Sequence, residues 1–212
     1  MKIDVLGVKV NTETKSEILG RIEDSLKQDK SIFIATPYSE SIVAAQKDLQ
    51  FRNILNLADI ALPDGIGILW AANFLKHRTH NLYVLWRLLV SLLSIIFNPK
   101  FIRDPIPEKI SGSEFVWDLA ELASKNNYSI FLLGGYGNTP ARAGERLKQK
   151  FPNLKIACAY SKLSFPRRRE SIPGSPIQAG MTENVVNLIN SSGADLLFVA
   201  LGPVRQEKWI SR

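Results

Sequence analysis

The feature that most constrains the fold is a regular alternation of short apolar runs with longer stretches whose apolar residues recur every three or four positions. The first pattern is typical of buried strands and the second of helices. Strands alternating with helices favour a parallel sheet covered on both faces. The predicted strands cover residues 2–10, 31–35, 60–62, 129–133, 154–159 and 195–201; the predicted helices cover 18–26, 42–46, 49–57, 68–75, 113–124, 139–150 and 182–191, with a last helix from Val204.

The composition is that of a packed protein, with 45% hydrophobic and 22% charged residues in 212. We therefore predict a single α/β domain over residues 1–212, a doubly wound, mostly parallel, Rossmann-like sheet with helices on both faces. A single cysteine, Cys158, excludes an intrachain disulfide and a thiolate metal cluster. The first residues lack the apolar run of a signal peptide, which makes the cytoplasm the expected location.

The net charge of +7 favours an anionic partner. Nucleic acid, a nucleotide-sugar diphosphate and the acidic face of a membrane all fit that charge. Nucleic acid is the weakest of these readings because the sequence shows neither a reading helix nor stacking aromatic residues.

An apolar segment over residues 77–105 interrupts the alternation. Its centre, residues 81–97, reads NLYVLWRLLVSLLSIIF and lies between basic residues. This centre is shorter than the ~20 apolar residues that a membrane-spanning helix needs. A helix in the membrane interface, a contact in a homo-oligomer and a core helix all remain open. The flanking cations and the aromatic pair Tyr83 and Trp86 favour the membrane surface.

A second segment, residues 164–181, reads SFPRRRESIPGSPIQAGM and has almost no core-forming residues. It is predicted to be an exposed, low-complexity inserted loop. Its three consecutive arginines are interpreted as a solvated run, since no aromatic residues are interleaved with them.

Four turns follow predicted strands, and they contain Thr36, Asp64, Gly134 and Gly202. Ligands of open α/β sheets gather at the carboxyl ends of strands. Asp64 is placed to act as a general base, although capping of the next helix is the commoner reason for an Asp at such a position. The Gly134-Gly135 turn opens a helix whose amides can meet a diphosphate, yet a plain tight turn has the same pattern.

Taken in order, these turns resemble the signature of the WecG/TagA/CpsF glycosyltransferases. The resemblance covers most of the chain outside the two unusual segments. It rests on residues 6–8, Thr36-Pro37, residues 45–48, 58–67 (ADIALPDGIG), 107–113 (PEKISGS), 133–135 (LGG) and 194–202 (ADLLFVALG), followed by Gln206-Glu207-Lys208-Trp209.

The resemblance implies an inverting transfer of an N-acetylmannosamine-type sugar from a UDP donor to a polyprenyl-diphosphate-linked acceptor, without metal or other cofactor. Cell-surface polysaccharide or teichoic acid synthesis at the inner face of the cell membrane would be its setting. By this resemblance Asp64 is the candidate base and Thr36 positions a substrate. The residues expected to bind substrate are Tyr38, Gly65, Gly67, Ser111, Gly112, Ser113, Gly134, Gly135, Gly202, Arg205, Gln206 and Glu207. Arg205 is equally well read as a surface residue.

Three departures from the family pattern stand out. Tyr38 occupies a position where the family commonly has Asn, the segment around residues 81–97 lengthens a connection, and family members continue beyond the Gln-Glu-Lys-Trp helix whereas this sequence ends at Arg212. The last departure predicts a C-terminally truncated chain. The competing function is therefore a catalytically inactive, membrane-associated module that retains nucleotide-sugar binding.

Overall fold

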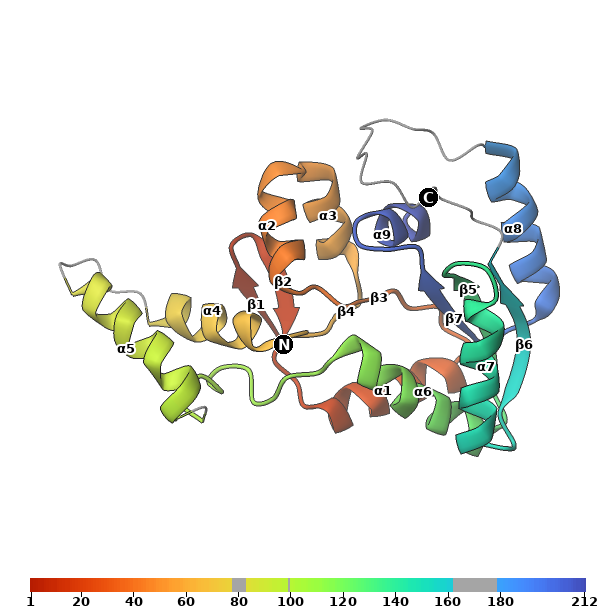
Figure 1. Ribbon diagram of the computed structural model, residues 1–212, viewed down its shortest axis with the longest axis horizontal. Helices are drawn as coiled ribbons and strands as arrows, with labels where there is room; N and C mark the ends of the chain where they lie inside the picture. The colour runs from red at the N-terminus through yellow and green to blue at the C-terminus, as the bar shows by residue number, and fades with distance from the viewer. Residues whose placement is uncertain (78–82, 99, 162–178) are drawn as a thin grey trace. The chain divides into compact units, whose positions relative to one another are not determined.

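The computed structural model describes residues 1–77, 83–98, 100–161 and 179–212. This part of the chain is mixed α/β, with helices around small sheets (Figure 1), which confirms the predicted α/β class, whereas the doubly wound, Rossmann-like arrangement stays a prediction. It divides into two compact units. The first comprises Met1–Val116 with Pro203–Arg212, and the second comprises Trp117–Gly202.

The first unit opens with an antiparallel hairpin of β1 (Lys2–Val5) and β2 (Val8–Asn11). The prediction of one continuous strand over residues 2–10 was wrong. Leu6 and Gly7 both have positive φ, 53° and 85°, and two such residues in succession form the tight turn that reverses a strand.

Two very short parallel strands follow, β3 (Ile34–Ala35) and β4 (Ile60–Ala61), joined through α2 (Ser39–Lys47) and α3 (Leu49–Leu57). A hydrogen bond from the Leu62 amide to the Ala35 carbonyl, 2.8 Å long, extends the pairing by one residue. Because the strands are parallel, the segments after Ala35 and after Ala61 emerge at the same edge.

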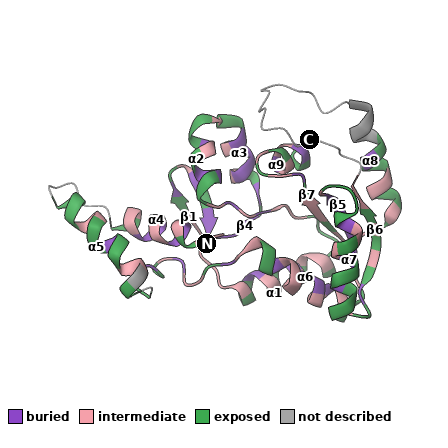
Figure 2. Ribbon diagram, in the orientation of Figure 1, coloured by how far each residue is buried: buried purple, intermediate pink, exposed green. Residues whose placement is uncertain are grey.

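The other helices of the first unit are α1 (Lys15–Lys27), α4 (Ile66–Lys76), α5 (Val84–Phe97) and α9 (Arg205–Ile210). Thr14 and Glu17 form a capping box that starts α1. Figure 2 shows the buried residues gathered around the hairpin and the helices that cover it. This core contains Val5, Val8, Val10, Ala35, Ile42, Ala45, Phe51, Leu55, Ala58, Ile68, Leu69, Ala72, Ile102 and Ile106.

The second unit contains a three-stranded parallel sheet in the order β6-β5-β7. Its elements are most of α6 (Gly112–Asn126), then β5 (Ser129–Gly134), α7 (Thr139–Lys150), β6 (Lys155–Tyr160), α8 (Ala179–Ser192) and β7 (Leu196–Ala200). β5 is central and buried from Ile130 onward. Helix α7 lies along β5 and β6 (Figure 1), and Gly144 of this helix is buried next to Leu132 and Ile156.

The two unusual segments differ in outcome. Residues 84–97 of the apolar segment form α5, while its residues 78–82 and 99 lie outside the described residues. None of the described helices combines the length and the apolar character that a bilayer crossing requires. The predicted loop over residues 164–181 lies outside the described residues up to position 178, and positions 179–181 belong to α8, which begins earlier than expected.

Candidate active site

The carboxyl ends of β3 and β4 bring Thr36 and Asp64 to one edge. The Asp64 amide donates to the carbonyl of Pro37 at 3.3 Å and to that of Leu62 at 2.9 Å, which ties the two strand ends together. Both Thr36 and Asp64 are partly exposed, whereas Pro37 between the strand and helix α2 is buried. The backbone thus holds Thr36 and Asp64 at the same edge, and both residues have access to solvent.

A third segment closes on the same edge. The Ile110 amide donates to the carbonyl of Pro63 at 3.1 Å, and the Gly112 amide donates to Oδ2 of Asp64 at 3.0 Å. A Cβ added at Gly112 would lie 3.0 Å from Cγ2 of Thr36 and 3.3 Å from Oδ2 of Asp64. Gly112 therefore packs against both Thr36 and Asp64, and a side chain at residue 112 would press against both.

Gly112 is also the first residue of α6, a helix of 15 residues. The amides of a first helical turn have no partner within the helix, and the helix dipole favours a negative charge there. Oδ2 of Asp64 occupies this position. Among the described residues no other hydrogen bond to the Asp64 carboxylate is present, which leaves Oδ1 available to a ligand.

Two glycines shape the turn after Asp64. Gly65 has φ 101°, a conformation that side chains rarely adopt, and it caps the amino end of α4. Gly67 lies against the Ser39 hydroxyl so closely that an added Cβ would collide with it. The glycines therefore allow α4 to start beside α2 immediately after the carboxylate.

Tyr38 lies in an acidic neighbourhood. Its hydroxyl donates to Oε2 of Glu40 at 3.3 Å. The pKa of Tyr38 is raised, first by burial, then by the charge of and hydrogen bond to Glu40, with smaller contributions from Glu207 and Asp64. The phenol therefore stays protonated at neutral pH and can act as a hydrogen-bond donor.

Helix α9 supplies the buried carboxylate of Glu207, which is only 6% exposed. Its Oε1 accepts a hydrogen bond from Nε2 of Gln206 at 3.0 Å, and its Oε2 is buried without a partner among the described residues. An unsatisfied buried carboxylate oxygen is costly, and such groups often mark ligand sites. Val204, just before the helix, has φ 66°, a strained value for a β-branched residue.

An ion pair anchors α9 to α3. Nζ of Lys208 lies 2.6 Å from Oδ2 of Asp48, whose other oxygen accepts from the Phe51 amide and caps α3. The pKa of Asp48 is lowered, chiefly by the hydrogen bond from Lys208 and then by that from the Phe51 amide. No sequence signal joins these two residues, because 160 positions separate them.

The remaining predicted residues of the first unit are Ser111 and Ser113, which flank Gly112, and Arg205 in α9. The hydroxyls of Ser111 and Ser113, on either side of Gly112, are 3.1 Å apart. Arg205 is exposed at the start of α9. The structure thus brings Thr36, Asp64 and Gly112 together and places a hydroxyl pair beside them, while the roles of these residues stay predictions.

The second unit carries the glycine turn. Gly134 has φ 107°, and an added Cβ would collide with the Ala200 carbonyl oxygen, so the ends of β5 and β7 approach too closely for any side chain. The Gly135 amide donates to the same carbonyl at 2.9 Å. Helix α7 starts five residues after Gly134, at Thr139, and Gly202 follows β7 with φ 89°. Gly134, Gly135 and Gly202 therefore gather at one end of this sheet.

A hollow of about 200 Å³ lies elsewhere in the first unit, at the amino ends of β3 and β4. Its charged lining comes from Arg21, Asp24, Lys30 and Asp59. None of the predicted site residues contributes to it, so its position gives no support to a role in sugar transfer.

The chain matches the family model described as glycosyl transferase WecG/TagA/CpsF family over residues 3–96 and 93–212. It is also similar to the N-acetylglucosaminyldiphosphoundecaprenol N-acetyl-beta-D-mannosaminyltransferases of Staphylococcus aureus strains NCTC 8325 / PS 47 and COL. Each is 23% identical over 211 residues, which make up 99% of this chain and 66% of the relative. The chain thus spans just under two thirds of their length. The family match covers almost the whole sequence and confirms the predicted resemblance: the chain belongs to the WecG/TagA/CpsF family of glycosyl transferases.

Proposed function

We propose that this protein transfers an N-acetylmannosamine-type sugar from a UDP donor to a polyprenyl-diphosphate-linked acceptor sugar, with inversion at the anomeric carbon. Family membership supports the reaction class, and the names of the relatives supply the acceptor and the transferred sugar. The observation that carries the proposal is the Asp64 carboxylate, held by the Gly112 amide beside Thr36.

The chemistry of inversion requires a base on the acceptor side. The acceptor hydroxyl oxygen forms a bond to the anomeric carbon while the bond from that carbon to the UDP oxygen breaks, and the hydroxyl proton must leave. The Gly112 amide fixes Oδ2 of Asp64, so Oδ1 is the atom we assign to take the proton. Thr36, in contact with the same glycine, is assigned to orient a substrate hydroxyl.

The donor side requires groups that stabilise negative charge on the departing diphosphate. We assign this task to the amides of the Gly134-Gly135 turn and the start of α7. The strand order supports this choice. β5 pairs with β6 on one side and with β7 on the other. The chain therefore adds one strand on one side of β5 and the next strand on its other side, which is a reversal of the strand order. Right-handed crossovers would then place α7 and α8 on opposite faces, the doubly wound arrangement whose ligands bind at such a reversal.

The other predicted residues have supporting roles in this proposal. Gly65 and Gly67 shape the turn that carries Asp64, and Tyr38 is assigned to exchange its hydrogen bond to Glu40 for one to a substrate oxygen. The nucleotide sugar is assigned hydrogen bonds from the two hydroxyls around Gly112 and from the start of α9, through Ser111, Ser113, Arg205, Gln206 and Glu207. A polyprenyl acceptor would place the reaction at the inner surface of the cell membrane.

The test is release of UDP from UDP-N-acetylmannosamine by the full chain, with and without a polyprenyl-diphosphate-linked N-acetylglucosamine. We expect release to depend on the acceptor, the product to have the opposite anomeric configuration, and Asp64→Ala to abolish the reaction. Glu23→Ala, on a partly exposed carboxylate of α1, is the matched control. Release that needs no acceptor, or a retained anomeric configuration, would contradict the proposal.

A further inference from the structure

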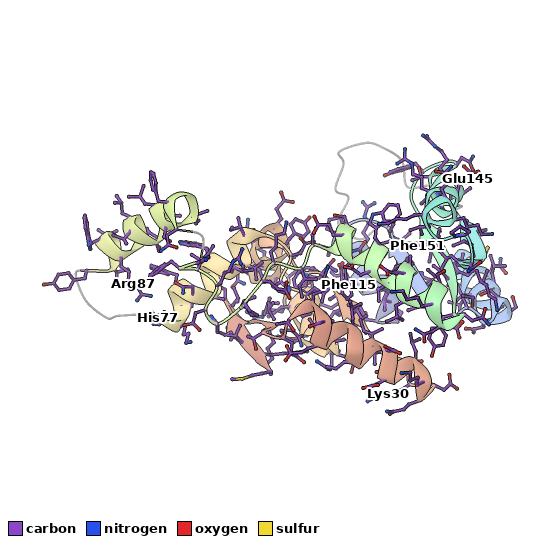
Figure 3. The ribbon with its side chains drawn as sticks, turned by 90° about the horizontal axis from the view of Figure 1, so that it is seen from below. Lys30, His77, Arg87, Phe115, Glu145 and Phe151 are labelled. Carbon is purple, nitrogen blue, oxygen red and sulfur yellow. The ribbon has the colours of Figure 1, made fainter. Side chains whose placement is uncertain are left out.

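Helix α5 turns its polar residues toward the protein and most of its large apolar side chains toward solvent, the reverse of what is usual for a surface helix. Its side facing the protein carries its polar residues together with Ile95, which packs against the core. Ser91 is only 2% exposed and accepts a hydrogen bond from Nε1 of Trp70 at 3.0 Å. Arg87 donates to the Phe74 carbonyl at 3.1 Å and lies over the Phe74 ring, on the side of α5 toward α4 (Figure 3).

The side facing away from α4 is apolar. Figure 2 shows most of α5 as exposed. We call Leu85, Trp86, Leu89, Leu92, Leu93 and Phe97 the α5 apolar face; they recur three or four positions apart, and their exposure runs from 45% at Leu92 to 80% at Phe97. Side chains at this spacing form one continuous stripe along a helix.

The α5 apolar face is large for a protein surface. Residues 83–101 hold ten of the twenty large apolar side chains that are exposed in the described part of the chain. The six side chains of the face expose on the order of 700 Å², above the roughly 300–600 Å² of the largest patch on an ordinary monomer. A patch of this size indicates a surface that is covered in use.

The charges around α5 are of one sign. Between Lys76 and Asp104 the sequence has no Asp or Glu, whereas Lys100 and Arg103 are exposed beyond the carboxyl end of the helix. Asp104 itself is paired with Lys76, at 2.6 Å, and its pKa is lowered mainly by that hydrogen bond. In a second copy of the chain, the segment between Lys76 and Asp104 would offer these cations no acidic partner. An anionic lipid surface complements them.

The length of α5 fits a helix that lies in the plane of the membrane surface. The 14 residues of α5 span about 21 Å, too short to cross the hydrocarbon core of about 30 Å. Tyr83 and Trp86, 71% and 68% exposed near the amino end, are the residue types that concentrate at membrane interfaces. We propose that the α5 apolar face inserts into the interface of an anionic bilayer and docks the protein on it.

This inference deepens the proposed function, because a lipid-linked acceptor requires an enzyme that reaches the bilayer. It is nevertheless measured separately, by lipid binding and not by turnover. The probes are vesicles of phosphatidylcholine alone and of phosphatidylcholine with phosphatidylglycerol, sedimented with the full chain.

The test variant combines Leu85→Gln, Leu89→Gln and Leu93→Gln, on side chains that already face solvent. Its matched control combines Leu49→Gln and Leu57→Gln, two exposed leucines of α3. We expect wild type and control to bind phosphatidylglycerol vesicles, and the test variant to bind roughly 10- to 100-fold more weakly. In wild type, phosphatidylglycerol vesicles should shift tryptophan emission to shorter wavelength, and Trp86→Phe should remove this shift. Because this second measurement uses a conservative substitution, it tests the proposal even if the triple glutamine variant folds poorly.

Three results would overturn the proposal: equal vesicle binding by test variant and wild type, equal binding to neutral and anionic vesicles, or an α5-dependent dimer that binds no vesicles. Failure of the docking proposal is distinguishable from failure of the proposed function. With a short-chain, water-soluble acceptor the test variant should transfer sugar at the wild-type rate, whether or not it binds lipid.

Discussion

Gly134→Ala tests whether the end of β5 needs a residue without a side chain. Its φ of 107° is a conformation that other residues rarely adopt, at a cost of about 1–3 kcal/mol. The new methyl group would also collide with the Ala200 carbonyl, and overpacking of this kind costs a further ~1–3 kcal/mol. We expect a loss of unfolding free energy on the order of 2–6 kcal/mol.

The assay is urea denaturation followed by circular dichroism, with Gly144→Ala as the matched control in the same unit. A Cβ at Gly144 would meet its nearest neighbour, Cδ1 of Leu132, at 3.4 Å, an ordinary contact, and alanine is the better helix former. The control should therefore change stability by no more than ~1 kcal/mol. If the two variants unfolded at the same urea concentration, the close approach of β5 and β7 at Gly134 would be refuted.

Three further predictions concern the first unit. Gly112→Ala should lower kcat by about 10- to 100-fold because its methyl group displaces the candidate base. Gly20→Ala, with open space around its Cβ, is the control. An unchanged kcat in Gly112→Ala would count against the contact between Gly112 and Asp64. Asp48→Asn keeps an N-cap but loses the ion pair with Lys208, so it should be less stable by ~0.5–1 kcal/mol at pH 7. Since the folded pKa of Asp48 is lowered, this difference holds above the unfolded pKa of about 3.9 and fades as the pH falls through the folded value; a difference independent of pH would refute it. Glu207→Gln should leave stability equal or higher while weakening UDP-sugar binding about tenfold by calorimetry, and unchanged affinity would remove Glu207 from the site.

Much of the fold could be predicted because periodicity and caps are local. Helix α7 begins and ends where the sequence pattern placed it, at Thr139 and Lys150. The turn at Leu6-Gly7 was missed because alternating β-branched residues continue on both sides of it, and only the backbone conformation of the two turn residues reveals the reversal.

The candidate site was partly predictable for the same reason. Parallel strands made it foreseeable that Thr36 and Asp64 would meet at one edge. The Gly112 contact had only the resemblance to point to it, and the Lys208–Asp48 pair had no signal at all, since pairing across 160 positions depends on tertiary packing. The inverted polarity of α5 was equally invisible, because its composition does not reveal which side packs on α4.

The central claim is that Asp64 accepts a proton during sugar transfer, and Asp64→Asn tests it most directly. Asn still accepts the Gly112 amide hydrogen bond but cannot take a proton. The measurement is single-turnover formation of the disaccharide-lipid product alongside calorimetric UDP binding. We predict a rate lower by about 10²–10⁴-fold with unchanged UDP affinity and stability. A variant that forms product at the wild-type rate would contradict the assignment of Asp64 as the base.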